Sequence, residues 1–326
     1  MVSCGSIVGS SKESANGENC VINSPKVSVG LAVFNGEPYL DEAIRSILAQ
    51  TFTDFELIIS DNASTDQTEE ICRAYAERDP RIRYYRNATN IGGANNENRT
   101  FDLSTGSYFR WAAHDDVCAP ELLAKCVEVL ERDPFVVLCY TQVVEIDEHG
   151  QRGRTISRNN ASSALAHVRF AAIASSSDFC EETYGLIRSD ILRKTRLQQN
   201  YTASDRTLLC ELSLYGRFHE IPEPLFFKRF HPKNVYSDWR ARMAWFDPKW
   251  EGKITFPFWL QFFDYLETIR RVPARPYVRF RCRLYMLRWL LIYGRKMVKD
   301  VLVALYMLAH RPEWRKARHA RARNWV

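Results

Sequence analysis

Two adjacent carboxylates, Asp115 and Asp116, directly follow a mostly apolar run of the sequence. The preceding residues, 109–113, are largely aromatic or small, which is typical of a buried strand, and residues 117–120 predict the start of a helix. In an open α/β sheet, ligands bind beyond the carboxyl ends of the strands, so this pair could hold a divalent cation against a phosphate. The alternative is structural: one acid caps the helix and the other is solvated.

A third carboxylate, Asp61, follows the apolar run 55–60, which predicts another strand. The first predicted strand, 27–34, is followed by neither G-x-G-x-x-G nor G-x-x-x-x-G-K-[ST], so the sequence supports neither dinucleotide nor P-loop binding. An acid after the second strand, together with the acid pair after a later strand, is what a metal-assisted nucleotide site without a glycine cradle requires.

The elements that must position these acids alternate regularly between strands and helices. Helices are expected from Pro38 to about 50, up to Arg78 with a Ser64–Gln67 capping box, over 95–103 and over 120–131. Further strands are expected at 82–86, 108–113 and 135–142. Alternation with short connections predicts an α/β fold, a mostly parallel sheet with helices on both faces.

Composition places the chain among ordinary globular proteins. Its 326 residues are 46% hydrophobic and 26% charged, enough for one large or two modest domains. The nine cysteines form no C-x-x-C pair and no zinc-like spacing, which favours a reducing, cytoplasmic compartment. Residues 1–25 are rich in Ser, Gly and Asn and lack the features of a signal peptide, so we expect a disordered leader.

Positive charge is concentrated towards the C-terminal end. The net charge is +6, but residues 270–326 hold 16 Lys and Arg against two acids, so the remainder is net acidic. Two apolar runs, 284–293 and 301–309, are separated by a polar segment, and neither reaches the ~18 to 20 apolar residues of a bilayer span.

This basic segment has several possible partners. On a helix, Arg288, Arg295 and Lys299 share one face, with Trp289 and Leu291 largely elsewhere, which is typical of a helix at an anionic membrane surface. We therefore expect membrane binding through 279–323. The alternative is packing on the body of the protein or on a second subunit as a homodimer. Nucleic-acid binding is not expected, because no recognised fold for it accompanies the charge.

Several segments together resemble the family-2 glycosyltransferases of the GT-A fold, which use nucleotide-sugar donors. The matching pieces lie in order over about residues 27–145, and they are 27–40, 46–52, 55–66, 87–92 and His114-Asp-Asp116, a version of the family's D-x-D motif. The resemblance implies a nucleotide-sugar-binding half at 26–145 and an acceptor-binding half at 146–260. The charge and the apolar spacing of residues 261–326 predict a basic amphipathic helical tail.

The resemblance also implies roles for donor-side residues. Asp61 would accept a hydrogen bond from the nucleotide base, with Phe34 or Asn35 near the base or ribose. Asp116 and Asp115 would hold Mn²⁺ or Mg²⁺ against the diphosphate, whose negative charge grows as the glycosidic bond breaks. UDP is the favoured nucleotide, and the role of His114 is left open. Further donor contacts are expected from Glu37, Asn90 and Arg229.

On the acceptor side, the stretch that begins at Thr202 predicts a helix ended by Gly216, with Ser204 or Asp205 as a structural N-cap. The resemblance implies instead that Asp205 is the general base of an inverting displacement. Asp178, Glu181 and Glu182 are competing candidates, with Glu181 second.

His231 follows a predicted strand at 224–228, where a lone histidine is usually structural. In related GT-A enzymes a histidine in a similar position completes the metal or diphosphate site, so His231 is a candidate metal ligand. The tryptophans at 239, 245, 250 and 259 could stack on sugars or fill a core.

The expected function is therefore metal-dependent, inverting transfer of one sugar to an acceptor hydroxyl on a glycan, glycolipid, lipid-linked or polysaccharide precursor. The Q-x-x-R-W signature of processive synthases is absent, which favours a single transfer. Two alternatives remain. A sugar-phosphate nucleotidyltransferase needs a glycine-rich basic loop that residues 34–37 do not supply. A catalytically inactive nucleotide-sugar-binding or membrane scaffold would not require the intact acids Asp61, Asp115, Asp116 and Asp205.

Overall fold

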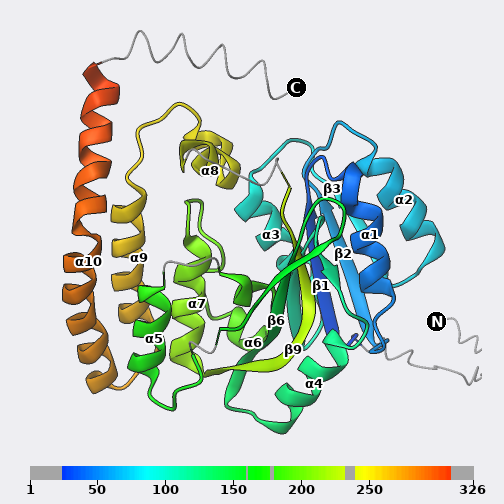
Figure 1. Cartoon of the computed structure of the whole chain (residues 1–326), viewed down its shortest axis with the longest axis horizontal. Helices are drawn as coiled ribbons and strands as arrows, with labels where there is room; N and C mark the ends of the chain where they lie inside the picture. The colour runs from blue at the N-terminus through cyan, green and yellow to red at the C-terminus, as the bar shows by residue number, and fades with distance from the viewer. Residues whose placement is uncertain (1–23, 159–160, 177–179, 232–238, 310–326) are drawn as a thin grey trace, which may run out of the picture.

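The computed structural model describes residues 24–158, 161–176, 180–231 and 239–309 (Figure 1). Within these ranges the strands form one sheet in the order β3-β2-β1-β4-β8-β6-β9-β5, with β7 paired to β6. The first four strands pair in parallel: β1 (Val27–Val33), β2 (Phe55–Asp61), β3 (Ile82–Arg86) and β4 (Tyr108–Ala113). The leader expected before residue 24 lies outside the described residues.

The second half of the sheet is mixed. Its strands are β5 (Val117–Cys118), β6 (Val136–Ile146), β7 (Arg152–Ile156), β8 (Leu186–Arg188) and β9 (Arg217–Arg229). β6 and β9 are parallel, whereas β8 runs antiparallel to β4 and β6, and β5 runs antiparallel to β9. The α/β fold with helices around the sheet is confirmed; β7 was not predicted.

Helices cover both faces of the sheet. In the first half they are α1 (Glu37–Leu48), α2 (Thr68–Arg78), α3 (Gly93–Asp102) and α4 (Leu122–Arg132). In the second half they are α5 (Ala166–Ser175), α6 (Ser189–Leu192), α7 (Ser204–Tyr215), α8 (Trp239–Phe246), α9 (Pro257–Arg271) and α10 (Pro276–Ala309), with 3₁₀ turns at Glu181–Tyr184 and Pro248–Trp250.

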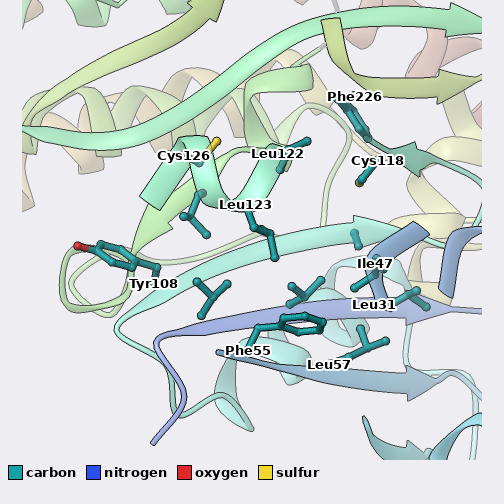
Figure 2. Close-up of a cluster of buried hydrophobic side chains, with 14 of the residues drawn as sticks. Leu31, Ile47, Phe55, Leu57, Tyr108, Cys118, Leu122, Leu123, Cys126 and Phe226 are labelled. Atoms are coloured by element: carbon teal, nitrogen blue, oxygen red, sulfur yellow. The ribbon is translucent and has the colours of Figure 1, made fainter. Parts of the chain in front are cut away.

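Side chains alternate across β4 and feed two separate cores. Tyr108 points into the core that α1 and α4 close, where Leu31, Ile47 and Leu123 also lie (Figure 2). Phe109 and Trp111 point into the other core, which α5, α7, α9 and α10 close. Both faces of the sheet are therefore dry, and polar groups that need water or a ligand are left to the ends of the strands.

Two helix starts differ from expectation. The N-cap of α7 is Ala203, at a left-handed φ of 69°, and no side chain caps this helix. The predicted cap by Ser204 or Asp205 is therefore wrong, because the Ser204 hydroxyl donates to the side chain of Gln198 instead. The capping box at Ser64 is also wrong: α2 begins at Thr68, and the Ser64 hydroxyl accepts from the backbone of Asn35.

The C-terminal segment forms one 34-residue helix, α10, which continues through Gly294. It lies beside α9 and contacts α5 (Figure 1). Its buried side chains include Met286, Trp289 and Tyr293, so the alternative that this segment packs on the body of the protein is realised for the described part. No helix among the described residues is both long enough and apolar enough to span a membrane.

Candidate active site

The acidic residues singled out in the sequence gather at one edge of the sheet. β1 lies between β2 and β4, with Val33 opposite Asp61 and Ala32 opposite Ala113. The loop after β1 and the acids after β2 and β4 therefore emerge side by side at the carboxyl ends of parallel strands, where α/β proteins bind their ligands.

The acid pair after β4 meets the end of β9. Antiparallel pairing places Val117, the residue after Asp116, opposite Phe227 of β9. The end of β9 therefore lies beside the acid pair. The backbone N–H of Arg229 donates to Asp116 Oδ1 at 2.9 Å, and His231 Nε2 lies 3.1 Å from Asp115 Oδ2. All four side chains are buried. The structure thus brings Arg229 and His231 next to Asp115 and Asp116, from which they are more than a hundred residues away in the sequence.

The Arg229 guanidinium holds this corner in place. Its Nε donates to the Asp115 carbonyl at 3.0 Å and its Nη2 to Glu42 Oε2 at 2.6 Å. The group lies 4.8 Å above the ring of Tyr39, which in turn lies 4.9 Å from the ring of His231. Arg229 is thus engaged within the protein as a structural cation, and a contact from it to a diphosphate remains a prediction.

Electrostatics at the acid pair favour a cation. Burial raises the pKa of Asp116 to about 8, and the neighbouring charge of Asp115 adds to the rise. The hydrogen bond from the backbone N–H of Arg229 and the positive charges of Lys228 and Arg110 lower the pKa of Asp116. Two carboxylates held this close in a dry site repel each other, and a divalent cation would relieve that repulsion.

The donor set fits a hard divalent metal only in part. Among the residues described, no three His, Cys, Asp or Glu side chains are placed to hold a metal ion by themselves. Mg²⁺ and Mn²⁺ at nucleotide sites commonly take one or two carboxylates and complete their coordination with phosphate oxygens and water. Asp115 and Asp116 with His231 beside them match that partial donor set.

Asp61 is occupied by partners from its own half of the sheet. Its fully buried carboxylate accepts hydrogen bonds from Ser64 N at 2.8 Å, Tyr84 Oη at 2.8 Å and Arg86 Nη1 at 2.6 Å. This carboxylate orders the loop after β2. Its predicted contact with a nucleotide base would have to be shared with these donors, and stays a prediction.

The other predicted donor-side polar residues also tie loops together. Asn35, at a left-handed φ of 51°, accepts from Thr65 N at 2.9 Å, and Glu37 accepts from Gln67 N at 3.2 Å. Asn90 Oδ1 accepts from Asn62 Nδ2 at 2.9 Å. Phe34 differs, because 41% of its surface is exposed at the end of β1. Its ring is available to stack on a ligand.

Asp205 lies in the first turn of α7, and burial raises its pKa, against the charges of Arg206 and Lys228. Burial raises the pKa of Tyr184, and the charges of Glu97, Asp116, Asp115 and Asp205 all raise it further. The charges of Asp205 and of the acid pair thus both act on Tyr184, whose ring is partly buried.

The competing candidates for the base are Glu181, Glu182 and Asp178. Glu181 is buried and makes ion pairs with Arg158 Nε at 3.0 Å and Lys228 Nζ at 3.3 Å. Both carboxylate oxygens of Glu181 are therefore engaged by cations within the protein. Glu182 has a pKa raised by burial to about 7. Asp178 lies outside the described residues.

Sequence reasoning missed Glu97, on α3. Burial, and then the charge of Asp205, raise the pKa of Glu97 to about 8. The sequence places Glu97 seven residues after Asn90 on a helix predicted only as structure, and nothing in its spacing indicated that it faces Asp205. Among the tryptophans, the ring of Trp245 covers Gly93 at the start of α3, whereas Trp250 and Trp259 line a pocket beside α9.

The α/β sheet thus carries acids at the ends of β2 and β4, and α7 carries a further acid, Asp205, in its first turn. Residues 28–196 match the sequence profile of Glycosyl transferase family 2. That segment is over half of the chain, and the chain belongs to this family.

Named relatives agree with this assignment. EpsE of Bacillus subtilis, which is named as a glycosyltransferase, is 32% identical over 200 residues, covering 61% of this chain and 68% of EpsE. An uncharacterized glycosyltransferase of Haemophilus influenzae is 28% identical over 235 residues, covering 68% of this chain and 69% of the relative. A third, MJ1057 of Methanocaldococcus jannaschii, is 34% identical over 131 residues; the match covers 40% of this chain and 45% of the relative.

Solved structures share the fold. TarS 1–349 of S. aureus in complex with UDP has a TM-score of 0.54 and 17% identity, covering 87% of this chain and 91% of that chain. The mannosyltransferase PcManGT of Pyrobaculum calidifontis, in complex with GDP-Man and Mn²⁺, has a TM-score of 0.57 and 20% identity, covering 88% of this chain and 76% of that chain. At such identities the likeness concerns the fold alone, and it confirms the predicted GT-A architecture.

Proposed function

We propose that this protein transfers one sugar from a nucleotide-diphosphate sugar to an acceptor hydroxyl, with inversion at the anomeric carbon. The observation that carries the proposal is the buried Asp115–Asp116 pair at the carboxyl end of β4, where the Arg229 N–H lies 2.9 Å from Asp116 Oδ1 and His231 Nε2 lies 3.1 Å from Asp115 Oδ2. The proposal places the reacting sugar between this diphosphate-binding pair and the Asp205 carboxylate. The division into a donor half, 26–145, and an acceptor half, 146–260, is part of this proposal.

In the reaction, the acceptor oxygen attacks the anomeric carbon while its proton passes to the carboxylate of Asp205. The bond between the anomeric carbon and the diphosphate oxygen breaks, and the nucleoside diphosphate leaves on the opposite face, so the configuration inverts. Burial raises the pKa of Asp205, which makes this carboxylate a stronger base than an exposed aspartate. Glu181, which is paired with two cations, is the second candidate.

The donor is held by residues at the strand ends. Asp116 and Asp115, with His231 beside them, would bind Mn²⁺ or Mg²⁺. A bound metal ion would offset the negative charge that develops on the leaving diphosphate. Phe34 offers its exposed ring to the base, and Asn35, Glu37, Asp61 and Asn90 keep the surrounding loops in place. UDP is the favoured nucleotide, while TarS and PcManGT are complexed with UDP and GDP-Man respectively.

The acceptor is proposed to be a glycan or a lipid-linked precursor, used on the cytoplasmic side of a membrane. The test is a thermal-shift panel of UDP- and GDP-sugars with and without Mn²⁺, because a ligand that binds only the folded state raises the unfolding temperature. We expect one donor to raise it only when Mn²⁺ is present. The shift should disappear in Asp116→Asn and persist in Glu121→Gln, which changes an exposed carboxylate at the start of α4.

An inactive nucleotide-sugar-binding scaffold is separated from an enzyme by turnover. With the donor that shifts the unfolding temperature, an enzyme should pass the sugar to an acceptor or to water and release nucleoside diphosphate. Asp205→Asn should abolish this release while donor binding persists. Donor binding without any release, over a range of acceptors, would favour the scaffold. No shift with any donor in the folded protein would contradict the proposed function.

A further inference from the structure

The outward face of α10 carries a long apolar stripe. Its members recur every three, four or seven residues and so lie along one side of the helix; they include Leu284, Leu287, Leu291, Val298, Leu302 and Leu305. All six side chains are exposed, Leu291 to 86% of its surface. Monomeric proteins seldom expose a continuous row of large apolar side chains unless the row binds something.

The stripe points away from the rest of the molecule. Met286, Trp289, Tyr293 and Met297 form the opposite side of α10 and are buried in the core that α5, α7 and α9 share. Figure 1 shows α10, in orange to red, as the outermost helix beyond α9. The helix is therefore anchored through one face, and an occupant of the other face must come from outside the described residues.

Basic residues flank the stripe on both sides. Arg281, Arg288 and Arg295 lie along one margin and Arg283 along the other, and all four are exposed. The single acid of α10, Asp300, is turned inwards, where it accepts from the backbone N–H of Phe258 at 2.9 Å. The outward face thus combines apolar area with positive charge alone, and residues 310–326 add six Lys and Arg against one acid.

This charge distribution decides between two occupants. The three- and four-residue spacing of the stripe would also suit a helix–helix seam with a second copy of the chain. In such a seam, however, the flanking positions would set arginine against arginine with no acid to pair them, which disfavours self-association. An anionic bilayer surface accepts both features, because the leucines enter the acyl boundary while the guanidinium groups meet the lipid headgroups.

An apolar pocket adjoins the same region. It has a volume of about 390 Å³ and is lined by Trp250, Phe256, Trp259, Phe263 and Val301. Val301 belongs to α10 and precedes Leu302 of the stripe, so the pocket lies beside the stripe and could receive part of a lipid chain. We infer that the α10 stripe lies flat on an anionic membrane, holding the protein at the surface without spanning it.

Vesicle binding tests the inference with the full chain and without any donor, so its result is independent of the proposed transfer. We expect flotation with phosphatidylcholine vesicles that contain phosphatidylglycerol and not with pure phosphatidylcholine vesicles, weakening as salt is raised. The double variant Leu287→Asp/Leu291→Asp should bind at least about tenfold more weakly, because two exposed leucines no longer enter the lipid. Phe135→Asp is the matched control, since Phe135 is equally exposed but lies in the turn before β6, and it should bind like the unmodified protein.

Light scattering of the purified protein tests whether a second copy of the chain occupies the stripe instead. A monomer in solution, together with vesicle binding lost in the double variant, supports the inference. A dimer that the double variant converts to monomers would assign the stripe to a second copy and overturn it. Failure of the folded full chain to bind anionic vesicles would overturn it equally, whether or not the protein transfers sugar.

Discussion

The backbone N–H of Arg229 donates to Asp116 across a sequence separation of 113 residues. This hydrogen bond joins the end of β9 to the acid pair after β4, so the two parts of the candidate metal site cannot move independently. The guanidinium of the same residue then spans from the Asp115 carbonyl to Glu42 on α1. The corner that holds the acid pair is therefore fixed by hydrogen bonds to β9 and α1.

Substituting Arg229 by lysine tests this arrangement. A lysine keeps the charge but cannot reach Glu42 and the Asp115 carbonyl together, so we expect a loss of about 2 kcal/mol or more in the free energy of unfolding. The concentration of Mn²⁺ needed for half-maximal activity should rise as well. Urea unfolding and a Mn²⁺ titration measure the two effects.

The control is Arg45→Lys, because Arg45 forms an exposed ion pair with Asp41 at 2.6 Å on α1. Exposed pairs contribute about 0 to 1 kcal/mol, so neither measurement should change appreciably. Equal behaviour of the two variants would mean that Arg229 does not order the site.

The assignment of the base predicts different failures for Asp205 and Glu181. In Asp205→Asn we expect kcat to fall by about 10² to 10⁴, with little change in the KM for the donor, because the amide cannot take the proton. In Glu181→Gln we expect chiefly a loss of stability, since Arg158 and Lys228 lose a buried partner. Steady-state kinetics and thermal unfolding of both variants decide the matter, and a larger fall in kcat for Glu181→Gln would exchange their roles.

The sequence was sufficient for the strands that end in the site. Residues 82–86 and 108–113 were predicted to the residue; 108–113 form a largely buried run, whereas 82–86 are mostly half-buried and carry the aromatic residues typical of strands. The second half was less predictable. Its strands pair over long separations, as Val136 does with Arg217, and β7 between them is exposed and polar.

The candidate site shows the same limit. Asp61, Asp115 and Asp116 could be found because they end strands, whereas Glu97 acquires its environment only when α3 packs near the start of α7. Asn98 of α3 holds the loop that precedes α7, because its side-chain amide donates to the Gln198 carbonyl at 2.8 Å and its side-chain carbonyl accepts from Gln198 N at 3.1 Å. No local pattern encodes a contact over a hundred residues.

Glu97 should make stability depend on pH. Its pKa is raised from an ordinary 4.5 to about 8, so the folded protein keeps this proton over a range in which the unfolded chain has lost it. The folded state then binds more protons, and stability from this group falls as pH rises between about 4.5 and 8. Glu97→Gln carries no charge at any pH and should remove this part of the slope.

Thermal unfolding of the metal-free protein at pH 5, 7 and 8.5 measures the effect. Relative to Glu97→Gln, the unmodified protein should lose about 2 to 4 °C in unfolding temperature for each kcal/mol of destabilisation as pH rises. Parallel curves for the two proteins would show that Glu97 titrates normally. Glu121→Gln, at an exposed carboxylate, should leave the slope unchanged.

Gly92, the N-cap of α3, lies against the end of α8. This residue has a φ of 89°, and a Cβ on it would lie 2.4 Å from the carbonyl oxygen of Phe246. Gly150 has a similar φ of 80°, but nothing lies within 4 Å of the corresponding position. Gly150→Ala should therefore cost only the backbone strain of about 1 kcal/mol, whereas Gly92→Ala adds a clash with backbone that cannot give way without shifting α8.

We expect Gly92→Ala to destabilise the protein by at least about 1 kcal/mol more than Gly150→Ala, measured by urea unfolding. Because α8 brings Trp245 over Gly93 beside the donor loop at Asn90, a shift of α8 should also raise the KM for the donor. Gly150, in the turn between β6 and β7, should leave that KM unchanged. If both variants lost stability equally and kept their KM, the contact between α8 and the start of α3 would have no part in donor binding.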